Sequence, residues 1–366
     1  MNLIEKNINS HSCVCIMAAH FTAEHALYMQ ELSAHYCPLG YDVHLFVDHL
    51  SPEKASFLSN QHNLSIVTAT VEECVEKNYK YCILAEPAKT GKGPVNVWDK
   101  ALFLLAHSQS YTNYWFLEDD ALLTTIESLS EIDNFYSTPV DLLIQTITSA
   151  KKIEQNKKAH LPYLWEGFAS NPFRLDNNGK PIRHDTPGFT QSSRLIRKSS
   201  WESLAKMEPL EGIDAGEFCM NWPLSHSVTS VVRFSGNLLK CIKKSIKDYK
   251  RLIFQEYLFG TLALHNNLTV RPAFFLSSIA HAPGDKSQQI QDLVDGNKGL
   301  MEFVRANAHN LSLIYHPLKG LENHLQFRSL MSEAVGSGKV KIHRAYSTSQ
   351  DPKSRPYLSY KPRKNV

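Results

Sequence analysis

The stretch YTNYWFLEDDALL, Tyr111 to Leu123, ends a run of aromatic and aliphatic residues with three adjacent acids, Glu118, Asp119 and Asp120. A run of this length and composition, bounded by polar residues, predicts a buried strand. Adjacent carboxylates repel one another and are costly to desolvate unless a cation neutralises them. Hard divalent cations such as Mg²⁺ and Mn²⁺ prefer oxygen ligands, so the stretch predicts a strand that ends at a metal site. The alternative is a solvated corner whose acids only cap the turn that follows.

Upstream of this stretch, segments with strand character alternate with segments of helical character. This order predicts an α/β fold with a doubly wound, mostly parallel sheet of the Rossmann-like type. Ligands of such sheets bind outside the carboxyl ends of the strands, so Asp48, at the end of the second expected strand, and the acidic triplet should border one crevice. The expected strands are Cys13–Ala19, Val43–Asp48 and Leu64–Thr70, and the expected helices are Phe21–Tyr36, one that starts after Ser51 with Pro52 at its first position, and Asn96–Ser108.

Length and composition limit the class of protein. The chain has 366 residues, of which 43% are hydrophobic and 20% charged, which is typical of a globular protein that buries a core. A formal net charge of +3 gives no reason to expect nucleic-acid binding. The sequence lacks an apolar stretch near the roughly 20 residues that span a bilayer, and its first residues lack the apolar centre of a signal peptide. We therefore expect a cytoplasmic protein, at most peripheral at the inner face of a membrane.

Four segments, VCIMAAH, HLFVD, WDKAL and WFLEDDALL, together resemble a glycosyltransferase of the GT-A fold. In that fold, an α/β half that binds the nucleotide sugar ends in an acidic DxD motif, of which residues 118–120 would be an EDD variant. The resemblance continues in GFTQSSRLIRKSSWESLA (188–205), FQEYLFGTLALHNNLTV (254–270) and LIYHPLK (313–319). It implies a nucleotide-sugar-binding half in residues 1–125 and an acceptor-side half in residues 126–330 that completes the same GT-A domain.

The resemblance also implies a donor, a metal and an acceptor. The donor would be a nucleotide-diphosphate sugar with Mn²⁺ or Mg²⁺ on its diphosphate, and the acceptor a glycan, a glycolipid or a protein. By resemblance, Asp120 and His316 would ligate the metal, and Asp119 would contact the metal, the donor ribose or the donor sugar. His281, which precedes a Pro-Gly turn, is the rival for the histidine position. Glu118 is expected to turn toward the sheet or to support its neighbours.

An acceptor hydroxyl that attacks with inversion of configuration needs a base to take its proton. Glu256 is the first candidate, because it is a single acid in the otherwise apolar stretch FQEYLFGTLAL and burial tends to raise the pKa of a carboxyl group. Asp214, in LEGIDAGEF, is the second candidate. The alternative for Glu256 is a surface glutamate paired with Lys250 or Arg251. An inverting course is slightly favoured over a retaining one, which would not need this base.

Donor contacts are expected from three places. Asp48 ends the second strand, where related folds hold the nucleoside, and Asp99 and Lys100 lie on the helix before the acidic triplet. The loop AKTGKGPVN (88–96) offers Lys92 to a phosphate, although it lacks the ending and the glycine spacing of a Walker A loop. A plain flexible connection is the alternative interpretation of that loop.

Two basic segments indicate further contacts. NLLKCIKKSIKDYKRLIF (237–254) places lysines on one helical face and aliphatic residues on another, which predicts a basic amphipathic helix. Such a helix is either attracted to an anionic membrane surface or is an ordinary solvated helix. The tail, residues 345–366, is rich in Pro, Ser and basic residues and is expected to be disordered.

The sequence therefore predicts a metal-dependent glycosyltransferase. Two other classes stay open: a non-catalytic α/β module that binds a sugar or a nucleotide, and another Mg²⁺-dependent enzyme such as a phosphoryl-transfer enzyme. The last would favour a phosphate-cradling glycine loop or a nucleophilic aspartate after the first strand, and CIMAAHF offers neither.

Overall fold

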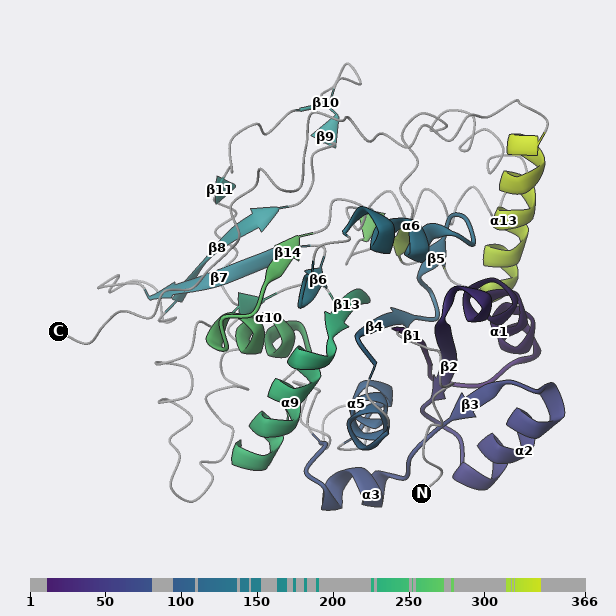
Figure 1. Cartoon of the computed structure of the whole chain (residues 1–366), viewed down its shortest axis with the longest axis horizontal. Helices are drawn as coiled ribbons and strands as arrows, with labels where there is room; N and C mark the ends of the chain where they lie inside the picture. Colours follow the sequence, from purple (N-terminus) through teal and green to yellow (C-terminus); the bar gives the residue numbers. More distant parts are fainter. Residues whose placement is uncertain are drawn as a thin grey trace.

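A computed structural model shows an α/β protein in which strands and helices alternate along the first part of the chain (Figure 1). The structure describes residues 12–80, 95–108, 111–136, 139–144, 146–152, 163–169, 174–175, 181–182, 189–190, 225–226, 229–249, 252, 255–272, 278–279, 314–316, 318 and 320–336. The expected tail, residues 345–366, lies outside them.

Seven strands form the main sheet: β1 (Ser12–Ala18), β2 (Tyr41–Val47), β3 (Ser65–Val67), β4 (Asn113–Glu118), β6 (Leu142–Ile144), β13 (Val231–Ser235) and β14 (Val270–Pro272). Their order is β14-β6-β13-β4-β1-β2-β3. β1 is parallel to β2 and to β4, and β2 is parallel to β3. β13 is antiparallel to β4 and β6, whereas β14 is parallel to β6. The predicted α/β class and mostly parallel sheet are confirmed, in a mixed, Rossmann-like form that takes strands from both sides of residue 125.

Helices cover both faces of this sheet, because successive strand residues point to opposite faces. Val14 and Ile16 of β1 belong to a core cluster shared with α1, α2 and α6, whereas Cys13 and Cys15 belong to a second cluster shared with α5, α9 and α10. The helices are α1 (Ala23–Tyr36), the short 3₁₀ turn η1 (Cys37–Leu39), α2 (Pro52–His62), α3 (Val71–Glu76), α5 (Val97–His107), α6 (Ser128–Phe135), α9 (Gly236–Tyr249), α10 (Gln255–His265) and α13 (Leu321–Gly336).

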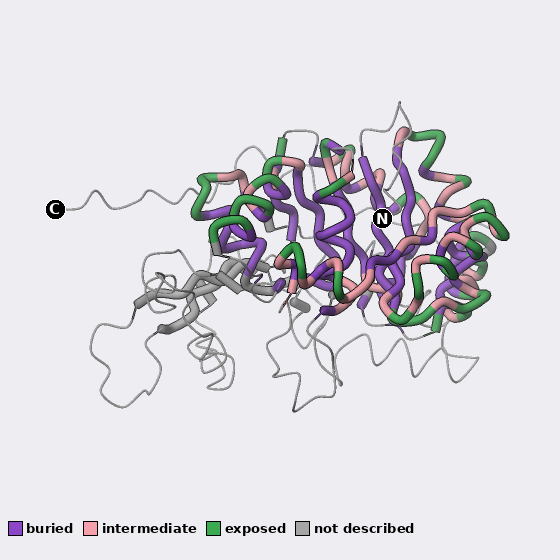
Figure 2. Tube along the Cα trace, turned by 90° about the horizontal axis from the view of Figure 1, so that it is seen from below, coloured by how far each residue is buried: buried purple, intermediate pink, exposed green. Residues whose placement is uncertain are grey.

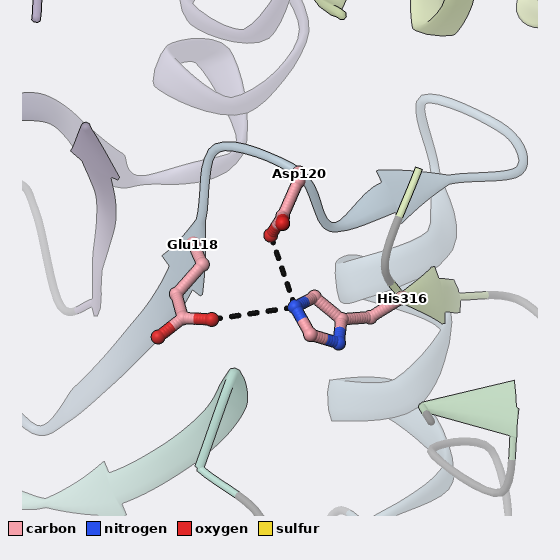
Figure 3. Close-up of side chains that lie close together, drawn as sticks. All are labelled: Glu118, Asp120 and His316. Carbon is pink, nitrogen blue, oxygen red and sulfur yellow. Dashed lines mark ion pairs between the residues drawn. The ribbon is translucent and has the colours of Figure 1, made fainter. Parts of the chain in front are cut away.

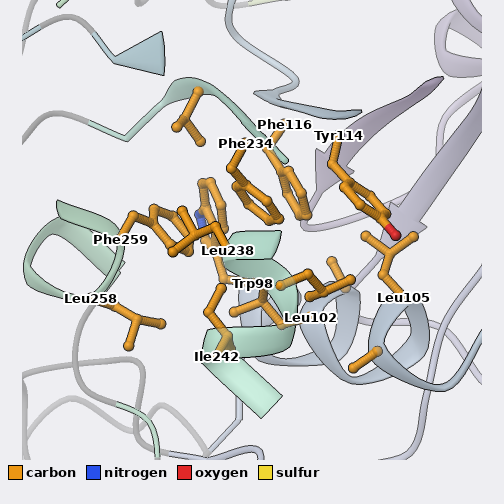
Figure 4. Close-up of a cluster of buried hydrophobic side chains, with 14 of the residues drawn as sticks. Trp98, Leu102, Leu105, Tyr114, Phe116, Phe234, Leu238, Ile242, Leu258 and Phe259 are labelled. Atoms are coloured by element: carbon orange, nitrogen blue, oxygen red, sulfur yellow. The ribbon is translucent and has the colours of Figure 1, made fainter. Parts of the chain in front are cut away.

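An aromatic stack lies at the centre of the second cluster (Figure 4). Trp98 of α5 stacks on Phe116 of β4 with ring centroids 5.3 Å apart and planes within 8°. Phe116 in turn lies 4.8 Å from Phe234 of β13, which is 5.3 Å from Phe259 of α10. Each such pair contributes about 0.5–1.5 kcal/mol beyond the area it buries. The stack therefore fastens α5, α10 and β13 to the strand that carries the acidic triplet.

Burial and capping follow the sequence pattern closely. All seven residues of β1 and of β2 are buried, as Figure 2 shows for the central strands. Ser51 caps α2 as expected, since its Oγ accepts a hydrogen bond from Lys54 N at 3.3 Å, and Pro52 is the first helical residue. Helix α3 was not expected, although Thr70 and Glu73 form the capping box that marks its start.

Small sheets complete the described second half. β5 (Leu122–Leu123), β16 (Ile314–His316) and β15 (Ser278–Ile279) form a three-stranded sheet in the order β15-β16-β5. β7 (Thr146–Lys152) and β8 (Tyr163–Ala169) pair antiparallel, with β12 (Ser225–His226) beside β7 and β11 (Phe189–Thr190) beside β8. β9 (Arg174–Leu175) and β10 (Pro181–Ile182) form a separate antiparallel pair.

Helix α9 is the predicted basic amphipathic helix, and its apolar face is internal. The aliphatic residues Leu238, Leu239, Ile242 and Ile246 are buried in the second cluster. On the outer face, Lys243 Nζ donates to Ala106 O at 2.6 Å, and Lys244 pairs with Asp248 one turn later, also at 2.6 Å. Contact with an anionic membrane therefore stays a prediction that rests on lysine charge alone. Among the helices that the structure describes, none is both long and apolar enough to cross a bilayer.

Candidate metal centre

The acidic triplet lies at the carboxyl end of β4, beside the carboxyl end of β1. The chain order reverses between these neighbours, because the chain runs from β1 to β2 and β3 on one side before it returns to β4 on the other. Ligands of open α/β sheets bind in the crevice at such a switch point. Backbone bonds fix the triplet there: Glu118 N donates to Ser230 O and Asp119 N to Met17 O of β1, each at 2.9 Å.

His316 reaches the triplet through the small sheet. β5, which follows the triplet directly, pairs antiparallel with β16, the strand that ends in His316. Leu318 N then donates to Asp120 O at 2.8 Å, which ties the chain after His316 to the triplet a second time. Gly320, with φ of 83°, adopts the left-handed backbone that favours glycine and turns the chain into α13. The imidazole of His316, a residue distant in sequence from the triplet, is thus brought to the end of β4.

Glu118, Asp120 and His316 form a group whose possible ligand atoms all lie within 4.8 Å of one another (Figure 3). His316 Nε2 is 3.0 Å from Asp120 Oδ1 and 3.3 Å from Glu118 Oε2. Trp98 Nε1 donates to the other oxygen of Glu118 at 3.3 Å and so orients that carboxylate from α5. The side chains of His316 and Asp120 are 9% and 10% exposed, whereas that of Glu118 is 33% exposed. Two of the three side chains are therefore buried, and solvent reaches the group at Glu118.

The carboxylates control the charge of the histidine. Burial by itself lowers the pKa of His316, but hydrogen bonds to Asp120 and Glu118, together with their negative charges, outweigh it and raise that pKa from 6.5 to about 9. At neutral pH the ring of the metal-free protein is therefore an imidazolium held between two carboxylates. A cation that uses Nε2 as a ligand must displace this proton.

The three side chains fit a divalent cation. Two cis ligands of an octahedral ion at roughly 2.1 Å are about 3 Å apart. The separations of His316 Nε2 from Asp120 Oδ1 and Glu118 Oε2, 3.0 and 3.3 Å, agree with that spacing. Two carboxylates balance the charge of the ion, and three protein ligands leave coordination positions for oxygen atoms of a bound molecule.

Helix α13 braces the segment that carries His316. His324 Nε2 donates to Leu318 O at 2.8 Å. Arg328 binds Glu31 of α1 through two bonds: Nε lies 3.0 Å from Oε1, and Nη2 bonds Oε2. Two parallel bonds of this kind fix orientation as well as distance. The position of the imidazole thus depends on how α13 is fastened to α1, beside which it stands in Figure 1.

Asp119 lies outside this group. Its Oδ2 is 3.3 Å from His25 Nε2 of α1, and its side chain is 37% exposed. Residues 119 and 120 form a turn directly after β4, closed by a bond from Ala121 N to Glu118 O at 2.9 Å, and this turn directs Asp120 to His316 and Asp119 to His25. Glu118 and Asp120 can therefore share an ion while Asp119 points toward α1. The geometry favours Glu118, in place of the expected Asp119, as the second carboxylate ligand beside Asp120.

The expected donor contacts on α5 have partners within the protein. Lys100 Nζ lies 3.0 Å from Asp48 Oδ1, and the two side chains are 6% and 18% exposed. This ion pair connects α5 to the carboxyl end of β2, at the same edge of the sheet as the candidate metal centre. Asp99 Oδ2 accepts a hydrogen bond from Asn96 N at 3.0 Å and so caps its own helix. Contacts of these residues with a donor stay predictions.

The other expected site residues are placed only in part. Glu256 stands in the first turn of α10. Asp214, Lys92 and His281 lie outside the described residues, although β15, which pairs with β16, ends two residues before His281. The catalytic and ligand roles of these four residues stay predictions.

Sequence reasoning missed three contributions to the site. Glu118 and Asp120 come together at a turn formed directly after β4, and the apolar run before Glu118 does not specify which acids that turn brings together. His25 stands three residues after Thr22, a cap position, but its contact with Asp119 leaves no local signal. Trp98 reads as an ordinary core residue, and its bond to Glu118 follows only from the packing of α5 on β4.

No protein-family model matches the chain, and no curated protein matches it. The functional interpretation therefore rests on the geometry of the metal centre and on the resemblance of the sequence segments.

Proposed function

We propose that the protein is a metal-dependent glycosyltransferase of GT-A type, which moves a sugar from a nucleotide-diphosphate sugar to a glycan, glycolipid or protein acceptor. The observation that carries this proposal is the position of Glu118, Asp120 and His316 at the switch point of the parallel sheet. A parallel sheet binds its ligand at that edge, and a carboxylate-rich site there suits a cation shared with phosphate oxygens.

Each residue of the centre then has a role in binding the donor. Glu118, Asp120 and His316 would hold Mn²⁺ or Mg²⁺, and the bound metal supplies positive charge to the diphosphate that leaves the anomeric carbon. Asp119 points away from this group and is partly exposed, so its carboxylate is available to accept hydrogen bonds from hydroxyl groups of the donor. Trp98 holds the carboxylate of Glu118 in one orientation.

The acceptor hydroxyl needs a base if configuration inverts, and we assign this role to Glu256 with Asp214 as the alternative. The support for Glu256 is its place in the first turn of α10, the helix whose Phe259 packs in the same aromatic cluster as Trp98. This assignment goes with an inverting course, which stays slightly favoured over a retaining one that would not need the base.

A non-catalytic binding module is the main competing function, and activity separates the two. Donor binding, which both functions require, is tested first, by calorimetric titration of the wild-type protein with a panel of nucleotide sugars, with Mn²⁺ and with chelator. We expect one donor class to bind only with Mn²⁺, and Asp120→Asn to lose that binding. Asp248→Asn serves as the matched control, because Asp248 is an exposed carboxylate on α9. If no nucleotide diphosphate binds in either condition, the proposal fails.

Turnover is tested on the same variants. Donor hydrolysis or sugar transfer by the wild type that is lost in both Asp120→Asn and Glu256→Gln, with the fold retained, supports the enzyme. Donor binding with no turnover by the wild type toward any acceptor supports the non-catalytic module instead.

A further inference from the structure

A contact between His25 Nε2 and Asp119 Oδ2 joins the acidic triplet to helix α1. His25 is 5% exposed, and its ring packs against Phe21 with centroids 6.2 Å apart. A buried histidine has few ring orientations, so a carboxylate that it binds is held in one place. Asp119 N is bonded to Met17 O at 2.9 Å as well, which fixes the backbone from which the carboxylate projects.

The helix cap decides which nitrogen of His25 carries the proton. Thr22 N donates to Nδ1 at 3.1 Å, and Thr22 Oγ1 lies 2.9 Å from the same atom. A nitrogen that accepts a backbone N–H cannot itself carry a hydrogen, so the proton of the neutral ring is on Nε2. Nε2 is the atom that faces Asp119 Oδ2, and it must therefore act as the donor in that bond. His25 takes the place in the cap that Glu73 takes in α3 and Asp99 in α5.

We infer that His25 is a positioning residue, which holds Asp119 away from the metal and presents it as an acceptor for a pair of hydroxyl groups on the donor. The inference rests on the proposed function and assigns separate tasks within it: Glu118 and Asp120 serve the ion, and Asp119 serves the hydroxyl groups. A carboxylate has lone pairs on both oxygens, so the bond to His25 leaves acceptor capacity for a ligand. The 37% exposure of the Asp119 side chain makes this capacity accessible.

The hydroxyl pair could belong to the ribose of the nucleotide or to the sugar that is transferred, and two probes separate these sources. Both are titrated with saturating Mn²⁺: the nucleotide sugar that the wild type binds, and the corresponding nucleoside diphosphate without its sugar. A variant that weakens the binding of both probes equally identifies the ribose as the source of the hydroxyl pair. Weakening of the nucleotide sugar alone identifies the transferred sugar.

Two substitutions of His25 isolate the donor bond from the cap. His25→Asn keeps an oxygen that can accept from Thr22 N, as the side chain of Asp99 does at the same cap position of α5, but it cannot reach Asp119. His25→Gln extends to the position of Nε2 and restores an N–H donor toward Asp119. Losing a hydrogen bond to a charged group typically changes an equilibrium constant by about tenfold or more, so we expect about tenfold weaker ligand binding for His25→Asn and recovery of most of it in His25→Gln.

A double-mutant cycle with Asp119→Asn then tests whether His25 acts through Asp119. Mn²⁺ binding without nucleotide should change by less than about twofold in His25→Asn, and the combined variant should bind ligand no more weakly than Asp119→Asn alone. Additive losses, or equal losses of Mn²⁺ and ligand binding, overturn the inference while the proposed function stands. Failure of the wild type to bind any nucleotide overturns both.

Discussion

Raising the pH should destabilise the metal-free protein through His316. Its folded-state pKa is raised from 6.5 to about 9, so the two carboxylates stabilise the imidazolium of the folded protein. This stabilisation is fully present below pH 6.5, where the ring is protonated in the folded and unfolded states alike. It is lost as the pH rises through 9, because the folded protein must then release the proton. The expected loss is about 3 kcal/mol, since one pKa unit corresponds to about 1.4 kcal/mol.

The assay is urea unfolding at several pH values between 6.5 and 9 in the presence of a chelator. The matched control is His316→Gln, which keeps an N–H donor near Asp120 but cannot titrate. Other groups change the stability of both proteins equally, so the difference between the two curves isolates the histidine. With excess Mn²⁺ the decline of the wild type should disappear, because the metal takes the place of the proton and stabilises the folded state by mass action.

Two results would contradict this reasoning. Parallel curves for wild type and His316→Gln would show that His316 is not held as an imidazolium between Glu118 and Asp120. Equal slopes for the wild type with and without Mn²⁺ would show that the metal does not compete with that proton.

Three further predictions concern the stability of the fold, two at the helix that braces His316 and one at the start of α9. Burial and the charge of Arg328 lower the pKa of His324 to about 4, so stability should fall by up to about 3 kcal/mol as the pH drops from 6.5 toward 4, and His324→Gln should flatten that decline in urea unfolding. Glu31→Gln leaves the buried guanidinium of Arg328 with a weaker partner and should cost about 1–3 kcal/mol, whereas an unchanged urea midpoint would show that this pair does not fasten α13. Gly236→Ala places a Cβ 2.7 Å from Tyr111 O and should cost about 1–3 kcal/mol, measured by thermal unfolding.

The strands and helices of the first part of the chain could be predicted because their signals are local. The apolar run before Glu118 gives β4, and Ser51 with Pro52 gives the start of α2. Most ends differ by one or two residues, as at β2, which was expected to include Asp48 and ends at Val47, whereas β3 ends at Val67, three residues before the expected Thr70. The placement of Asp48 and the acidic triplet at one edge of the sheet follows from the same pattern, since alternating strands and helices produce a parallel sheet.

The internal arrangement of the site could not be predicted in the same way. His316 was a candidate on resemblance alone, because it is brought to Asp120 by long-range contacts, the pairing of β5 with β16 and the bond from Leu318 N to Asp120 O. The ion pair of Lys100 with Asp48 also joins residues that are distant in sequence, and each reads separately as a contact for a ligand. Hydrophobic periodicity specifies which face of an element is buried, but it does not specify which polar side chains meet at the end of a sheet.

The pairing of β5 with β16 has a consequence for the synthesis of the chain. About 200 residues separate Asp120 from His316, so a cation bound by both closes a loop of that length, for which the entropic cost grows only slowly with length. A nascent chain that has emerged only to residue 313 lacks β16 and therefore lacks the imidazole. Until β16 is synthesised, Glu118 and Asp120 therefore lack the imidazole of His316 as a partner. Metal capture should thus be among the last steps of maturation, and chains truncated before β16 should retain the acidic strand end while binding Mn²⁺ only weakly.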